Sequence, residues 1–133
     1  MKVIHHNEKL NIVSLIERMS SSYINVDLSS YSLFLEDASE IHSFTSICKG
    51  KERIKEALNT IISDNVNKEI ILKSKSAFVI ILTGQNNDNP LSVSEIKNLS
   101  EFVEKYLKDK DILWGISVDQ SLGDEVKVVL LTK

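Results

Sequence analysis

The chain has 133 residues, with 16 basic and 19 acidic side chains and a formal net charge of −3. That length suits one ordinary domain, and the interspersed charges argue against nucleic acid or a membrane surface as a partner. The single cysteine, Cys48, cannot form an internal disulfide, and no apolar run approaches the roughly 18–20 residues of a membrane span. The sequence therefore favours a single cytoplasmic domain without a signal peptide.

The N-terminal third predicts two helices separated by a polar break. Leu10, Val13 and Ile16 recur at helical spacing within residues 10–19, and a second helical pattern covers residues 28–34. Between them lies the stretch "INVD", whose Asp27 can cap the second helix by accepting from free backbone N–H groups. Taken alone, this break is a helix cap.

The middle of the chain alternates strands and helices. Residues 39–48 predict a strand that ends before Gly50, and residues 51–63 predict an amphipathic helix. The continuous apolar run "AFVIILTG", residues 77–84, predicts a strand that is covered on both faces.

The last third begins with a capping box, "SVSE", in which Ser92 and Glu95 satisfy each other's free backbone N–H groups. The helix that follows is expected to bury Ile96, Leu99 and either Phe102 or Val103. Residues 112–119 and 125–133 predict two strands joined as a terminal hairpin. The element order predicts an α/β (α+β) two-layer sandwich with a four-stranded mixed sheet.

Residue patterns for metal or cofactor binding are absent. His5 and His6 are adjacent, His42 lies in a predicted strand, and none has a partner at metal-ligand spacing. Cys48 is expected to be a small packed side chain and not a nucleophile. The four glycines, at positions 50, 84, 115 and 123, cannot build a glycine-rich phosphate loop. We therefore expect no metal site and no cofactor bound by this chain alone.

Four motifs in order resemble the C-terminal globular domain of FtsZ, the bacterial tubulin homologue. The segment "INVDLSSYSLF" resembles the synergy loop and following helix of that family, and "GKERIKEAL" resembles a family helix start. The run "AFVIILTG" resembles a family strand ending in I-T-G, and "ILWGISVDQSLGDEVKVVLLTK" resembles the end of the domain with its G-D-E triplet. The resemblance covers residues 13 to 133.

The resemblance implies a four-stranded sheet with packed helices, an FtsZ/tubulin C-terminal-domain-like fold. It also implies that residues 1–22 are the end of the central interdomain helix and that residues 23–133 form the C-terminal-like domain. The GTP-binding domain of the family would precede this segment, and its glycine-rich loop has no counterpart in these 133 residues. GTP would therefore be held by a partner subunit or by the missing domain.

In the family, the synergy loop of one subunit completes the GTP hydrolysis site of the next. By resemblance, Asn25 and Asp27 occupy the first two polar positions of that loop and are the candidate catalytic residues. The second family aspartate is Ser30 here, and a hydroxyl is a poor base at neutral pH. We therefore expect a degenerate loop that stimulates GTP hydrolysis weakly or not at all.

Three functions remain open from the sequence. The first is an FtsZ-like cell-division domain that makes head-to-tail protofilament contacts, by self-association or with an FtsZ-type GTP-binding domain. The second is a free-standing, non-catalytic module that binds and modulates FtsZ filaments. The third is an unrelated small ligand-binding α/β oligomer, although no cluster of acids or bases marks its pocket.

Overall fold

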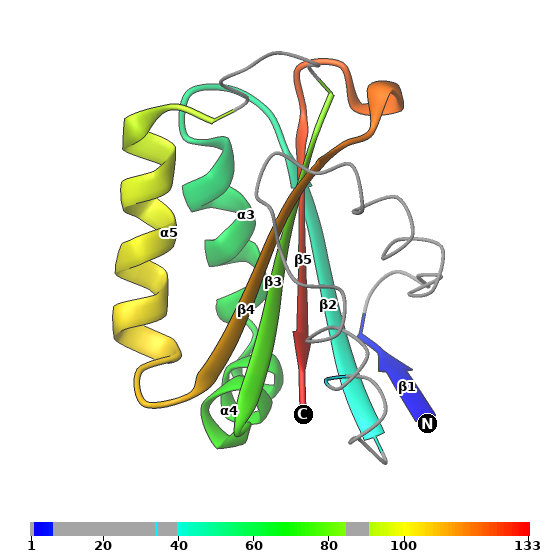
Figure 1. The fold of residues 1–133 in the computed structure, drawn as a ribbon, viewed down its shortest axis with the longest axis vertical. Helices are drawn as coiled ribbons and strands as arrows, with labels where there is room; N and C mark the ends of the chain where they lie inside the picture. The colour runs from blue at the N-terminus through cyan, green and yellow to red at the C-terminus, as the bar shows by residue number, and fades with distance from the viewer. Residues whose placement is uncertain (1, 7–33, 35–39, 85–90) are drawn as a thin grey trace.

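A computed structural model of the chain describes residues 2–6, 34, 40–84 and 91–133. In these ranges it contains a five-stranded mixed sheet with helices packed against one face (Figure 1). The strand order is β1-β2-β5-β3-β4. The strands are β1 (Lys2–His5), β2 (Glu40–Cys48), β3 (Ser76–Thr83), β4 (Asp111–Val118) and β5 (Val126–Thr132). The predicted α/β class and mixed sheet are confirmed, but the sheet has five strands and not four.

The expected terminal hairpin is wrong. Strand β5 does not pair with β4; it lies between β2 and β3 and is antiparallel to both. Strand β4 pairs in parallel with β3 at the edge of the sheet. Every residue of β5 except Lys127 is buried, whereas most of β4 is only half-buried. A central strand lies under the apolar layers on both faces of the sheet, so the more apolar β5 suits this position better than the partly exposed β4.

The fifth strand is β1, at the opposite edge. Lys2–His5 pairs in parallel with β2, with Val3 opposite Ile41. These residues are therefore extended and do not belong to the helix expected over residues 1–22. Their sequence explains this, because the β-branched Val3 and Ile4 favour a strand. Residues 7–22 lie outside the described ranges, and the domain boundary at residue 22 stays a prediction.

Three helices are described: α3 (Arg53–Ile62), α4 (Asn65–Lys73) and α5 (Val93–Tyr106). Helices α3 and α5 match the predicted ones, whereas α4 was not predicted from the sequence. Helix α4 is short and buries only Ile71, but Asp64 caps it by accepting from the N–H groups of Val66 and Asn67. None of these helices is long and apolar enough to cross a membrane.

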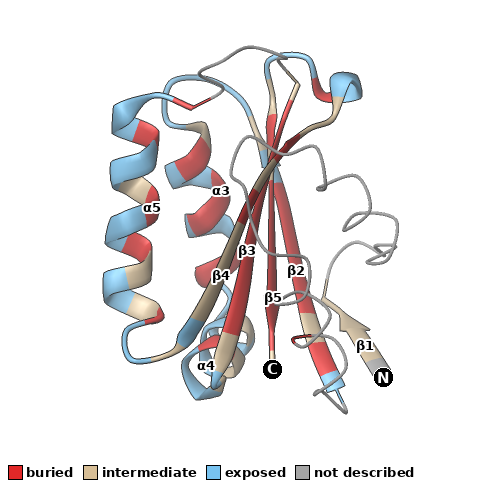
Figure 2. Ribbon diagram, in the orientation of Figure 1, coloured by how far each residue is buried: buried red, intermediate tan, exposed pale blue. Residues whose placement is uncertain are grey.

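Apolar side chains form two clusters, one on each face of the sheet. Figure 2 shows that buried residues cover most of the central strands β5 and β3. The cluster on the helix side joins α3, α4 and α5 to alternate residues of β2, β3, β4 and β5. The opposite cluster contains Phe34, whose ring meets Phe78 of β3 edge to face at 5.9 Å. Strand β3 is therefore buried on both faces, as its apolar run predicted. Phe34 is the only described residue of the predicted helix over residues 28–34, and it is helical.

Candidate functional site

The predicted synergy-loop residues Asn25, Asp27 and Ser30 lie outside the described residues, and their roles stay predictions. The other three motifs of the FtsZ resemblance are described. Strand β3 ends with the T-G pair, α3 begins after Gly50, and β5 begins directly after the G-D-E triplet. All three meet at one end of the sheet, together with the start of α5, at the top of Figure 1. Motifs that are far apart in the sequence thus gather at a single end of the molecule.

An ion pair between Arg53 and Glu95 connects these motifs. Arg53 Nε lies 2.6 Å from Glu95 Oε2, and Nη2 lies 3.2 Å from Oε1, so the contact is bidentate. Arg53 Nη1 also donates to the backbone carbonyl of Asp124 at 3.2 Å. The first turns of α3 and α5 are therefore tied to each other and to the G-D-E turn.

Glu95 is held from a second side by the predicted capping box, which is confirmed. Its Oε1 accepts from the Ser92 backbone N–H at 3.1 Å, and its own N–H donates to Ser92 Oγ at 3.2 Å. Burial by itself would raise the pKa of Glu95. The hydrogen bonds from Arg53 and Ser92 and the Arg53 charge outweigh burial, and the net pKa lies below its ordinary value. Glu95 is thus a structural carboxylate that stays ionised.

Two glycines at this end pack backbone against backbone. A side chain on Gly84 would collide with the backbone of Gly123, which lies directly against its Cα. Gly123 itself has φ +63°, in the left-handed region that favours glycine. The Asp119 N–H donates to the Thr83 carbonyl at 2.8 Å and fixes the chain between these glycines. Steric constraints therefore explain why glycine occupies both positions, one in the T-G motif and one in the G-D-E motif.

Exposed apolar side chains occur beside these motifs. Val93 and Ile96, on the first turns of α5, are 85% and 51% exposed. Ile96 was expected to face inward, and that expectation is wrong. The inward positions of α5 are taken by Glu95, Leu99 and Phe102, because the ion pair with Arg53 draws Glu95 into the interface. The end of the domain therefore presents apolar surface next to an ion pair that fixes α5.

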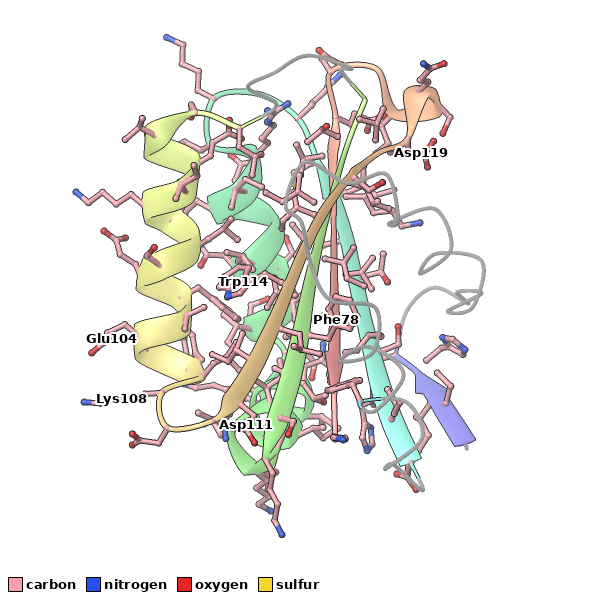
Figure 3. All side chains as sticks on the ribbon, in the orientation of Figure 1. Phe78, Glu104, Lys108, Asp111, Trp114 and Asp119 are labelled. Carbon is pink, nitrogen blue, oxygen red and sulfur yellow. The ribbon has the colours of Figure 1, made fainter. Side chains whose placement is uncertain are left out.

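Side chains at the β4 edge pack toward the helices. Figure 3 shows Trp114 on β4 on the side of α5 and Asp119 beyond the end of β4. Trp114 packs against the helix-side cluster, which agrees with its predicted position on an apolar face of β4. The Asp119 carboxylate accepts from the N–H and hydroxyl groups of Ser121 in the following turn. Both residues therefore have a structural role: Trp114 packs in the apolar cluster, and Asp119 stabilises the turn after β4.

Two histidines that are distant in the sequence contact each other. His6 Nε2 lies 2.9 Å from His42 Nδ1, although 36 residues separate them. Parallel pairing of β1 with β2 brings them together, and no local spacing pattern signals such a contact. Among the described ranges, no three histidine, cysteine, aspartate or glutamate side chains are placed to hold a metal ion. Cys48, at the end of β2, is a half-buried free thiol.

Comparison with known proteins finds sequence similarity to FtsZ. The cell division protein FtsZ of Porphyromonas gingivalis is 27% identical over 114 residues, which are 85% of this chain and 24% of that protein. The chain resembles FtsZ, as its motifs predicted. It spans about a quarter of the length of this curated relative. No family model matches the chain.

Solved structures share the FtsZ-like fold. A single-substitution mutant of FtsZ from M. jannaschii has a TM-score of 0.71 at 19% identity, covering 90% of this chain and 35% of that one. An empty FtsZ dimer from M. jannaschii has a TM-score of 0.61 at 21% identity, with coverages of 89% and 34%. TubZ of Bacillus thuringiensis serovar israelensis, in GDP-form protofilaments, has a TM-score of 0.57 at 12% identity, with coverages of 82% and 29%. The FtsZ-like and tubulin-like architecture is confirmed.

Proposed function

We propose that this chain acts as an FtsZ-like cell-division domain that makes head-to-tail contacts in a protofilament. The sequence similarity to FtsZ over 85% of the chain carries the proposal. The structural relatives include a dimer of FtsZ and protofilaments of TubZ, and these assemblies support self-association or a filament partner for this chain. The partner of this chain in the cytoplasm would be an FtsZ-type GTP-binding domain or a second copy of the chain.

The proposed contact face includes the end of the domain where the motifs gather. Val93 and Ile96 supply exposed apolar surface there, and burial of apolar surface is the main favourable contribution to most protein–protein association. The Arg53–Glu95 pair fixes the first turn of α5, so the surface is presented in one orientation. A fixed surface loses little conformational entropy on binding, which favours association.

The same proposal assigns the GTP to the neighbouring subunit or to a preceding domain. Asn25 and Asp27 would face that nucleotide as a degenerate synergy loop, with Asp27 holding a water and Asn25 fixing the loop. Phosphoryl transfer depends mainly on positioning and charge stabilisation, and these two residues would supply part of both. With Ser30 in place of a second carboxylate, hydrolysis would be weak or absent, so the chain would not be an enzyme on its own.

The Ser30 position favours a second candidate, a non-catalytic module that binds FtsZ filaments and modulates them. Such a module needs the contact face but no hydrolytic loop. The third function considered from the sequence, an unrelated ligand-binding oligomer, is disfavoured because similarity in sequence accompanies the shared fold. We therefore retain two functions, and docking on an FtsZ-type nucleotide domain tests both.

Co-sedimentation with polymerising FtsZ from Porphyromonas gingivalis tests the proposal. We expect the chain to pellet with the polymer in the presence of GTP and to change the polymer mass. If the chain acts as a subunit-like domain, the amount bound should saturate at about one copy per filament end or per FtsZ subunit. If it acts as a modulator, it should change filament length when the ratio of chain to FtsZ is low. Absence of co-pelleting together with unchanged polymer mass would exclude both functions.

A further inference from the structure

His6 and His42 form an in-plane hydrogen bond at the edge of the sheet. Their nearest nitrogens, Nε2 and Nδ1, are 2.9 Å apart. The ring planes are inclined by only 17°, while the ring centroids are 5.2 Å apart. Because the centroids are so much farther apart than the nitrogens, the nearly parallel rings lie edge to edge. The contact is therefore an N–H···N bond that needs one donor and one acceptor.

The positions of the protons follow from Glu40. His42 Nε2 lies 3.0 Å from Glu40 Oε1, and an ionised carboxylate only accepts, so this nitrogen carries a proton. In neutral His42, Nδ1 is then the acceptor, and His6 Nε2 donates to it. One added proton can sit on His6 Nδ1 without disturbing this bond. A second added proton must occupy His42 Nδ1, which leaves two donors facing each other.

Charged groups of both signs surround the histidine pair. Burial lowers the pKa of His6, and His42 and His5 lower it further, while Asp64 at the start of α4 raises it. Glu40 faces His42 from its own strand, and Lys73 and Lys133 line the groove beside His42. The His6 ring stacks on Phe44, with centroids 4.5 Å apart and planes inclined by 5°. With two added protons, two N–H donors face each other at the 2.9 Å contact, and separating the rings removes that repulsion.

Strand β1 is a short edge strand. It has four residues, and among the described residues it pairs with β2 alone and packs Val3 against the apolar cluster that contains Phe34 (Figure 1). The His6 N–H donates to the Ser43 carbonyl at 3.0 Å, directly beside the histidine pair. We propose that the His6–His42 pair is a proton-controlled latch, which holds β1 on β2 with at most one added proton and releases it with two. Release uncovers the backbone edge of β2, a surface on which another strand can pair.

Hydrogen exchange measured by NMR tests the latch, with the His6 amide as the reporter. Protection factors correct for the intrinsic effect of pH on exchange, and they should be measured from about pH 7.5 to about pH 5, on both sides of the ordinary histidine pKa. We expect the protection of the His6 amide to fall at least about ten-fold on acidification, while the amides of β3 and β5 keep theirs. Unchanged protection of His6 across this range would overturn the proposal, as would a His6 amide that is unprotected at the highest pH.

Two variants separate the latch from general acid sensitivity. In His42→Gln, the amide oxygen can accept from His6 and the amide nitrogen can donate to Glu40, but the side chain takes up no proton. We expect its His6 amide to stay protected at acidic pH. The control His5→Gln retains both members of the pair and should lose protection like the wild type. An equal loss in His42→Gln and in the wild type contradicts the latch, and protection of the β3 and β5 amides verifies that each variant is folded.

Discussion

Arg53 at the start of α3 and Glu95 at the start of α5 form a bidentate ion pair whose side chains are only 14% and 8% exposed. The pair joins the first turns of two helices that also share the helix-side apolar cluster. Because Arg53 also donates to the Asp124 carbonyl, the turn before β5 is anchored as well. One polar contact thus sets the relative position of three motifs in the FtsZ-like fold.

Removing Arg53 should destabilise the domain strongly. Arg53→Met leaves the Glu95 carboxylate buried without its cation, and breaking a buried ion pair from one side costs about 3–5 kcal/mol. Urea unfolding should show this loss of free energy. In Arg53→Met/Glu95→Gln, the loss should be smaller than the sum of the single losses, because neither partner is left charged. As a control, Lys73→Met breaks the exposed pair with Glu69 and should have no measurable effect.

Glu95 should also make the domain sensitive to acid. Its pKa in the folded chain lies below the ordinary value of 4.5, so the unfolded chain takes up this proton first as the pH falls. The stabilisation is therefore complete above about pH 4.5 and is lost as the pH falls through the lower, folded pKa. Urea midpoints at about pH 6 and about pH 3 should show a smaller decrease for Glu95→Gln than for the wild type. Equal decreases would mean that other carboxylates account for the acid sensitivity.

Gly84→Ala should be among the most damaging single-methyl additions in the chain. The added carbon would meet the Gly123 backbone, which cannot move aside like a flexible side chain. Overpacking of this kind costs about 1–3 kcal/mol, and a rigid neighbour places the change at the upper end. Gly50→Asn separates backbone strain from collision, since Gly50 has open space around it and its φ of +100° strains any residue with a side chain. Thermal unfolding should show a larger shift for Gly84→Ala, which meets a rigid backbone, than for Gly50→Asn, which carries the backbone strain alone.

Local patterns in the sequence predicted most of the elements but not the order of the strands. The alternation in β2, the apolar run of β3 and the capping box of α5 each depend on near neighbours, and each prediction is confirmed. The position of β5 between β2 and β3 depends on burial of both its faces, and adjacency in the sequence wrongly favoured a hairpin with β4. The parallel pairing of β1 with β2 likewise brings His6 to His42 across 36 residues. Contacts that depend on pairing between distant strands leave no periodic pattern in the sequence, so they were not predicted.

The ion pair illustrates the same limit at the candidate site. Arg53 and Glu95 each occupied a recognised motif, one in a helix start and one in a capping box, but nothing local indicated that they meet. Their meeting also explains why Ile96 faces outward, because Glu95 takes the inward position on α5. The gathering of the motifs at one end follows from the topology, which places the end of β3 beside the starts of α3 and α5. The sequence therefore predicted the individual motifs at this end of the sheet but not how they contact one another.

Charged substitutions on α5 should weaken docking on FtsZ. Val93→Glu/Ile96→Glu removes exposed apolar side chains from the proposed contact face, and each buried side chain of this size contributes about 1.5–3 kcal/mol. We expect at least about a ten-fold loss of affinity for FtsZ filaments in co-sedimentation. Val66→Glu/Leu72→Glu is the matched control, because these side chains of α4 are similarly exposed, at 63% and 46%, but lie on the opposite end of the domain. Equal losses in both double variants would place the contact elsewhere.

Restoring the missing carboxylate should restore part of a hydrolytic site. Ser30→Asp supplies the charge that the FtsZ resemblance assigns to this position, and a positioned acid or base contributes about 10²–10⁴-fold to a rate. Mixed with a GTP-loaded FtsZ nucleotide domain, Ser30→Asp should raise GTP turnover by about 10²-fold over the wild type. Ser29→Asp adds the same charge one residue away and should not raise it, and Asp27→Asn should cancel the gain. Turnover that stays the same with and without the restored carboxylate would argue against a vestigial catalytic loop and leave the filament contact as the function of this domain.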